Sequence, residues 1–446
     1  MTSALQSLPI YKSVKSAYSI AICSYIKDLP PATSYKMHFI RDIHNAKPNM
    51  RMYLKPQIAL LLPCLLLCSA NAYSAPFTPA SDAEVLEQLP FKANSPVTRE
   101  LRRLRAELTG NPHNLDKAVA LAQRYYQLAL ADGDPRFIGY AQAALVPWWE
   151  MAEPPVAVLV QRAALRQYNH DFERALADLK LATRLQPHHG TAWSLLAAIH
   201  MVQADYATAK QDCEKLHDLA SKLIVTACTA TVDSLSGQAQ QAYSTLSRAY
   251  TSTPAAPAAE KLWVLTRLAE ISDRLGRAEE ADVYFKAALR LDITDAYLLA
   301  VYAEFLHDEN RHQEVIALLK DKERSDVLLM RLALAEKALN TPKAAEHQEV
   351  IRSRFDAARL RGDKLHIQDE ARFYLYFLDN PKESLRLAQE NWRDQHEPSD
   401  ARMLLEAALA ARDKTAAQPA LEWYTQSRIE DRHLQRLVKL ITELKS

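Results

Sequence analysis

The chain has 446 residues, of which 48% are hydrophobic and only 7 are glycine. A chain of this length would on average hold roughly 30 glycines. Sheet proteins and phosphate-binding loops need glycine where φ is positive or a ligand approaches the backbone, so the composition argues against both and favours an all-α fold.

The first feature along the chain is typical of a secretory signal peptide. Residues 50–55 are a short basic stretch, residues 58–67 are apolar, and Ala70-Asn71-Ala72 follows as an A-x-A cleavage site. We therefore predict a signal peptide at 50–75, cleaved at Ala72, and export to the bacterial periplasm. The apolar run is too short for a membrane span, so we expect no membrane insertion of the mature chain; peripheral contact stays open.

Residues 1–49 precede this signal and show no helical period. We interpret them as a mis-assigned translation start, with the initiator at Met50 or Met52, or as a disordered leader. An organelle-targeting leader is the rival, because Asp28 and Asp42 are the only acids in this stretch, although its shortage of Arg speaks against that. Removal of the basic leader leaves a mildly acidic chain, so nucleic acid is not expected as a partner.

The next segments lead into the helical part of the chain. Residues 76–96 are rich in Pro and Ala and are predicted to be a linker. Residues 97–155 are expected to hold a basic helix at about 97–109 and a variant first helical pair at about 115–130 and 135–149. Asp134 and Pro135 suit the cap and the first position of the second helix of this pair.

Two alanine series recur with a period near 34 residues. They share steps of 34, 33, 39 and 34: one is Ala163, Ala197, Ala230, Ala269 and Ala303, and the other is Ala175, Ala209, Ala242, Ala281 and Val315. Because both series share the long step, whole units are duplicated. Small residues at two fixed offsets of such a period indicate stacked pairs of helices. The long step comes from the insert at 254–259.

The units at 156–329 resemble the tetratricopeptide repeat (TPR) family. Trp193, Leu196, Ala197, Tyr206 and Ala209 illustrate the pattern in one unit, and Pro187 and Pro254 close others. Segment 133–149 also resembles exported bacterial TPR proteins. The resemblance implies a right-handed superhelical solenoid of helix-turn-helix hairpins and an array at 156–329 whose function is to bind other proteins. It does not supply an activity.

Cys213 and Cys228 are the only cysteines beyond the signal peptide. An even pair in an oxidising compartment favours a disulfide, and successive antiparallel helices place the two residues level. The alternative is two buried small side chains, because packed helix axes lie 8–10 Å apart whereas a disulfide needs Cα atoms within about 7 Å. The sequence leaves both open.

Residues 330–446 are predicted to be degenerate TPR-like helices that end in a capping helix. We place helices from 326 onward at about 326–339, 342–361, 364–378, 382–395, 399–411, 415–427 and 430–444. The last carries polar residues on one side, which suits a solubilising cap; these are Glu430, Asp431, Arg432, Gln435, Arg436, Lys439 and Glu443.

No catalytic motif is present, and no cofactor or metal is predicted. His188-His189 lies in a turn without a second cluster at metal-ligand spacing. The histidines of the C-terminal helices are scattered without acidic or His partners at helical spacing; they are His347, His366, His396 and His433. We therefore expect a protein that is not an enzyme, with a helical enzyme sited in the C-terminal helices as the weaker alternative.

The TPR resemblance implies where a partner would bind. The family's groove positions lie on the first helix of each unit and correspond here to Gln167, Tyr168, Ser194, Met201, Thr231, Glu270, Asp273, Arg274, Glu304 and His307. The early positions are small or apolar and the late ones acidic, which suits a peptide with an apolar end and a basic end. These side chains alternatively face solvent or an internal helix. A family clamp for C-terminal carboxylates needs Lys, Arg and Asn, and only Arg274 qualifies, so that mode is not expected.

The sequence thus predicts an exported scaffold or assembly factor of the cell envelope that binds another protein or a peptide. The alternative function is a stable structural subunit of an envelope complex whose inner face is permanently occupied.

Overall fold

The computed structural model describes residues 94–363 and 365–444, and all regular secondary structure in them is helical. The all-α fold class is therefore confirmed. Residues from Leu101 onward belong to one compact unit. The expected leader (1–49), signal peptide (50–75), cleavage site at Ala72 and most of the linker (76–96) lie outside the described residues.

The N-terminal helices differ in one respect from those expected. They are α3 (Pro96–Thr109), α4 (Leu115–Asp132), α5 (Arg136–Ala144) and α6 (Val146–Trp149). The expected single helix at 135–149 is divided at Leu145, whose ψ of 2° is not helical. Pro147 lies in the first turn of α6 and has no N–H to continue the ladder of the preceding helix, which explains the break.

The repeat region folds into consecutive hairpins. Its helices are α7 (Val156–Tyr168), α8 (Phe172–Leu185), α9 (Gly190–Val202), α10 (Tyr206–Glu214), α11 (Lys222–Leu235), α12 (Ala239–Thr251), α13 (Ala258–Arg274), α14 (Ala278–Leu289), α15 (Ala296–Asp308) and α16 (His312–Leu319). Each helix contacts the next one along the chain. The residues of both alanine series are at most 3% exposed, because their small side chains let neighbouring helices approach closely.

The turn inside each hairpin repeats with the same spacing as the alanines. One residue per turn has a left-handed backbone; these residues are His170, Ala204, Gly237, Gly276 and Asn310. The N–H of the following residue bonds to a carbonyl near the end of the first helix, as from Arg277 to Ser272, which is the Schellman arrangement of a helix C-terminus. The repeat that the alanine spacing indicates is therefore also present in the backbone conformation of the turns.

A disulfide joins Cys213 of α10 to Cys228 of α11, with the two Cα atoms 5.6 Å apart. This is one of the two alternatives that the sequence left open. Cys213 lies in the last turn of α10, close to the loop where the two helices approach. The usual distance of 8–10 Å between packed helix axes therefore does not prevent a disulfide at this point.

The C-terminal helices begin and end within a few residues of the expected positions. They are α17 (Asp326–Ala338), α18 (Ala344–Leu360), α19 (Ile367–Tyr376), α20 (Pro381–Trp392), α21 (Pro398–Ala411), α22 (Gln418–Ser427) and α23 (Arg432–Thr442). Local caps explain several boundaries: Asn380 and Asp431 accept backbone N–H groups at the starts of α20 and α23. We call α19–α23 the C-terminal segment.

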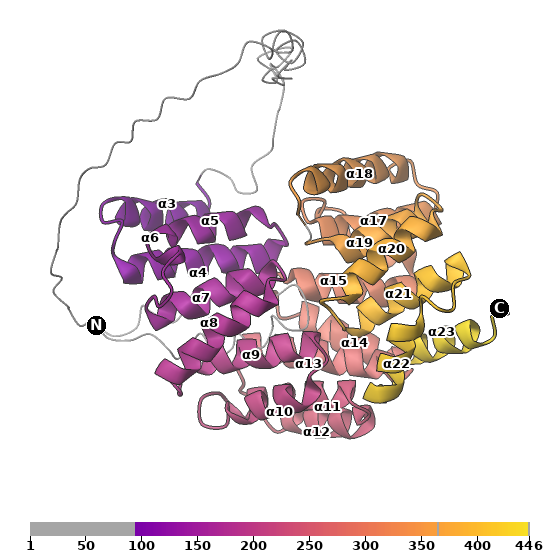
Figure 1. The fold of residues 1–446 in the computed structure, drawn as a ribbon, viewed down its shortest axis with the longest axis horizontal. Helices are drawn as coiled ribbons and strands as arrows, with labels where there is room; N and C mark the ends of the chain where they lie inside the picture. The colour runs from indigo at the N-terminus through magenta and orange to yellow at the C-terminus, as the bar shows by residue number, and fades with distance from the viewer. Residues whose placement is uncertain (1–93, 364, 445–446) are drawn as a thin grey trace, which may run out of the picture. The chain divides into compact units, whose positions relative to one another are not determined.

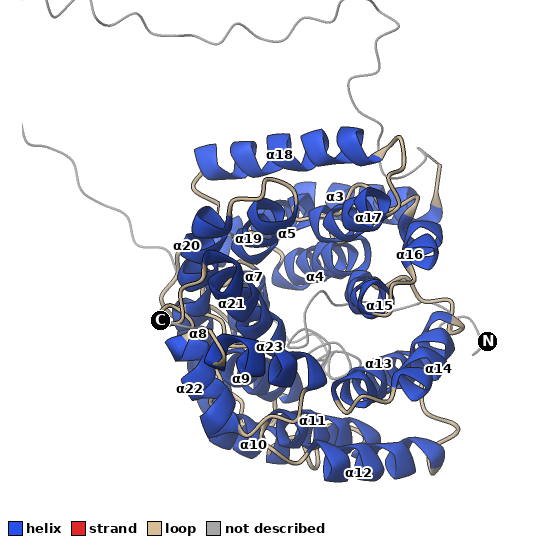
Figure 2. Cartoon of the chain, turned by 90° about the vertical axis from the view of Figure 1, so that its right-hand side faces the viewer, coloured by secondary structure: helices blue, strands red, loops and turns tan. Residues whose placement is uncertain are grey.

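The C-terminal segment packs against the first helices of the repeat hairpins. One hydrophobic core combines residues from 197–271 with residues from 371–441. The N–H of His396 donates to the carbonyl of Val202 at 2.7 Å, and α23 contacts α13 (Figures 1 and 2). At Gly237 a Cβ would lie 3.0 Å from the Cβ of Arg428, so glycine serves both the turn and this close approach.

Candidate functional site

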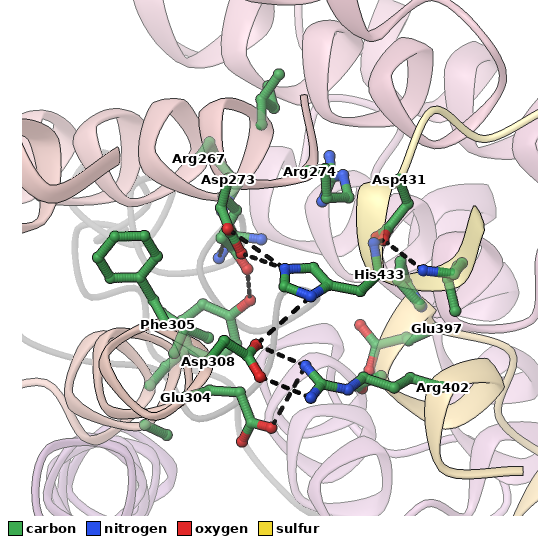
Figure 3. Close-up of a pocket in the computed structure, with 18 of the residues that line it drawn as sticks. Arg267, Asp273, Arg274, Glu304, Phe305, Asp308, Glu397, Arg402, Asp431 and His433 are labelled. Carbon is green, nitrogen blue, oxygen red and sulfur yellow. Dashed lines mark hydrogen bonds and ion pairs between the residues drawn. The ribbon is translucent and has the colours of Figure 1, made fainter. Parts of the chain in front are cut away.

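A cavity of about 220 Å³ lies where the C-terminal segment meets the first helices of three hairpins (Figure 3). Its lining residues come from α11, α13, α14, α15 and α17, and from α19, α21 and α23 of the C-terminal segment. Its wall combines apolar and charged side chains. The charged ones are Arg267, Glu270, Asp273, Arg274, Glu304, Asp308, Arg331, Asp369, Arg372, Glu397, Arg402, Asp431 and His433.

The structure brings half of the expected groove residues to this cavity. Those that line it are Thr231, Glu270, Asp273, Arg274 and Glu304. The four early positions lie elsewhere and are at most 5% exposed; they are Gln167, Tyr168, Ser194 and Met201. His307 does not line the cavity, and its ring lies 4.7 Å from that of His312.

In the structure, Asp273 and Asp308 on this face pair with basic side chains of the chain's own C-terminal segment. Arg432 of α23 contacts Asp273 at 2.7 Å. Arg402 of α21 contacts Asp308 through two hydrogen bonds of 2.6 and 2.7 Å. The paired geometry matches a guanidinium to a carboxylate. An internal helical segment therefore occupies much of the face that the sequence interpreted as an open groove.

Glu304 lies at the centre of a network of ion pairs. Arg331 and Arg402 approach its carboxylate at 3.3 and 3.9 Å, and Arg372 donates a hydrogen bond to it. Burial by itself would raise the pKa of Glu304, but the positive charges of Arg372, Arg331 and Arg402 outweigh burial and hold the pKa below its ordinary value. Glu304 therefore keeps a negative charge in the folded protein and pairs with these arginines.

Glu270 is half-buried in a second cluster. Arg267 pairs with its carboxylate at 2.8 Å, and the hydroxyl of Tyr297 donates to it. Burial raises the pKa of Glu270 above its ordinary value, although the charge of Arg267 and the Tyr297 hydrogen bond oppose the rise. Arg267 also lies over the ring of Tyr297, 4.7 Å from its centre.

His433 connects α23 with α13 and α15. Its Nε2 lies 3.4 Å from Asp273, and its Nδ1 lies 3.8 Å from Asp308 (Figure 3). Burial lowers the pKa of the imidazole, but the hydrogen bond and charge of Asp273 and the charge of Asp308 outweigh burial and raise it, against the opposing charge of Arg402. The protonated ring thus stabilises the contact of α23 with the repeat hairpins.

Arg274 differs from the other arginines of the wall. Its Nη2 donates to Ser234 Oγ at 2.7 Å, and its buried Nε has no hydrogen-bond partner. The other wall arginines each pair with at least one carboxylate, in the pairs Arg267–Glu270, Arg331–Glu304, Arg372–Glu304 and Arg402–Asp308. Within the part of the chain that the structure describes, Arg274 forms no such pair.

Sequence reasoning missed the C-terminal half of this site. Arg372, Arg402 and His433 gave no local signal, because they recur at no repeat spacing. Arg432 was expected on the polar face of a capping helix, yet it contacts Asp273 and Glu309. The cap prediction describes only the outer face of α23, where Gln435, Arg436 and Lys439 are exposed.

The described residues contain no group of three or more His, Cys, Asp or Glu side chains placed to hold a metal ion. In the same residues, no helix is both long enough and apolar enough to cross a membrane. No protein-family model and no curated protein matches the sequence of this chain.

Proposed function

We propose that the chain is an exported, periplasmic helical-repeat protein that binds another protein or a peptide, as a scaffold or assembly factor of the cell envelope. In this proposal the consecutive hairpins form a right-handed superhelical solenoid of the TPR type. The common spacing of alanines and left-handed turn residues supports that architecture.

The cavity carries the proposal for a binding role. Five side chains at positions that the TPR resemblance assigns to a partner groove line the cavity. The C-terminal segment covers this face but leaves the cavity unfilled. Ion pairs fix most of the wall charges in position. Such fixed charges recognise a ligand without a large cost of ordering side chains on binding.

The proposal is tested by filling the cavity without changing its charges. Ala300 lines the cavity and is 4% exposed, so Ala300→Phe places a ring inside it. A tagged wild-type chain is expected to recover a partner from envelope fractions, and the Ala300→Phe variant to lose it while keeping helical circular dichroism. The matched control is Ala345→Phe on the exposed side of α18, which should recover the partner as the wild type does.

A stable structural subunit of an envelope complex is the second candidate. The early groove positions, such as Ser194 at 0% and Met201 at 2% exposed, are buried within this chain itself, so a subunit of this kind would contact its complex through another surface. A partner that binds Ala300→Phe as well as it binds wild type would contradict the cavity as the binding site and support this second function.

A further inference from the structure

We propose that the cavity binds a small zwitterion, namely a free amino acid or a peptide of very few residues with an apolar side chain, whose carboxylate contacts Arg274 and whose ammonium group contacts Asp431. This inference rests on the proposed peptide-binding function and narrows its ligand.

The position of Arg274 provides the anion-binding half of this site. It is the wall arginine that forms no ion pair with a described carboxylate, and Ser234 holds its guanidinium through one hydrogen bond of 2.7 Å. A guanidinium has five N–H donors, so donors remain for a ligand. A ligand carboxylate would supply the charge-assisted hydrogen bonds that the other wall arginines already make within the protein.

Asp431 provides the cation-binding half. It lines the same cavity from the start of α23 and is 8% exposed. Its Oδ1 accepts the backbone N–H groups of His433 and Leu434 at 2.9 and 3.0 Å, and no described Lys, Arg or His side chain forms an ion pair with it. Figure 3 shows Arg274 and Asp431 on the same side of the cavity, with no bond between them.

The size and the remaining wall of the cavity limit the ligand. An engineered cavity of about 150 Å³ admits benzene, so about 220 Å³ suits one amino acid or a very short peptide rather than a helix. Apolar side chains complete the wall between the charged groups; they include Leu235, Ile271, Val301, Phe305 and Leu434. A ligand with an apolar side chain would remove this surface from water.

The chemistry is tested with blocked ligands on the purified full chain. Calorimetry and thermal unfolding are measured with leucine, other apolar amino acids and their dipeptides, then with N-acetyl-leucine and leucinamide. Saturable binding of a free amino acid or dipeptide is expected. Blocking either end should weaken it by about tenfold or more, because each block removes one charge-assisted hydrogen-bonded contact. The free amino acids and the dipeptides distinguish the two sources of the zwitterion.

Variants assign each end to its residue. Arg274→Gln should bind leucine and leucinamide equally, and Asp431→Asn should bind leucine and N-acetyl-leucine equally. Asn caps a helix about as well as Asp, so Asp431→Asn should keep α23 folded. The control is Arg248→Gln on the exposed side of α12. This variant should still bind leucine more tightly than leucinamide and more tightly than N-acetyl-leucine.

Two results would overturn the inference. One is the absence of saturable binding by any amino acid or dipeptide to the folded wild-type chain, and the other is an Arg274→Gln variant that still discriminates against leucinamide. If partner recovery nevertheless depends on Ala300, the proposed function survives and only the zwitterion fails. If zwitterions bind but no partner is recovered, the ligand class stands and the scaffold role fails.

Discussion

At the scale of single residues, the charges inside this protein are matched across segments that lie far apart in the chain. Asp273 in α13 meets Arg432 and His433 in α23, and Asp308 in α15 meets Arg402 in α21. Half-buried pairs of this kind are costly when one partner is lost, because the other charge stays away from water. The register of the C-terminal segment therefore depends on individual charged side chains.

His433 makes this contact dependent on pH. Its pKa is raised in the folded protein, so its stabilising contribution is fully present below the unfolded pKa of about 6.5 and is lost as pH rises through the folded value. We expect His433→Gln to lower the free energy of unfolding by about 1–2 kcal/mol near pH ~6. The difference from wild type should shrink as pH rises through the folded pKa, in urea titrations at several pH values.

The exposed His217, which pairs with its neighbour Asp218, supplies the control for this series. His217→Gln should leave the free energy of unfolding unchanged at every pH, because exposed ion pairs contribute little. A His433→Gln variant whose deficit grew with rising pH would contradict the assigned direction of the pKa shift.

At the scale of elements, α10 is short and depends on its neighbours. It has nine residues, three of them buried, and is followed by a run of turns to Ser221. The disulfide from Cys213 to Cys228 fastens its end to α11. A covalent link at this point limits how far α10 and the following turns can open.

Removal of this link should destabilise the hairpin. The two cysteines are 15 residues apart, and closing a loop of that length contributes about 3 kcal/mol in the chain-entropy account. The double variant Cys213→Ala with Cys228→Ala is therefore expected to unfold at lower urea, by about that free energy.

A reductant provides the internal control for this experiment. Dithiothreitol should lower the stability of the wild type and leave the double variant unchanged. Equal stability of oxidised and reduced wild type, or two free thiols in protein isolated from the envelope, would contradict the expected role of the bond.

At the scale of the whole molecule, the C-terminal segment changes how the repeats hold together. In an ideal repeat array each unit contacts only its neighbours, so truncation removes terminal units and leaves the others folded. Here the core around α9–α13 includes Trp392, Leu404 and Leu434 from the far end of the chain. These long-range contacts should make unfolding more cooperative than in an open array.

Truncation after Gly362 tests this expectation. It would expose the apolar side chains of α9–α13 that the C-terminal segment covers, and we expect the thermal midpoint to fall by on the order of 10 °C or more, with increased binding of a hydrophobic dye. Deletion of α3, whose only buried residue is Leu101, is the comparison and should cost little. A truncated chain that kept the thermal midpoint of the full chain would contradict an integrated core.

Local sequence was sufficient to place most of the helices. The alanine spacing, the capping residues and the turn residues act within one hairpin or between neighbours, so a period of 34 is visible without coordinates. The split between α5 and α6 at Leu145 was missed although its cause, Pro147, is also local. The disulfide stayed open because the usual spacing of helix axes cannot say how closely two particular residues of adjacent helices approach.

The sequence by itself determined the all-α class and the succession of hairpins, because these depend on propensity, spacing and caps that act over a few residues. Only the tertiary structure decided that the C-terminal segment covers the first helices of the hairpins, and where the cavity between them lies. The residues that meet there, such as Glu304 with Arg372 and Asp273 with Arg432, are 68 and 159 positions apart. No repeat period relates such pairs, and they come together through the packing of whole helices.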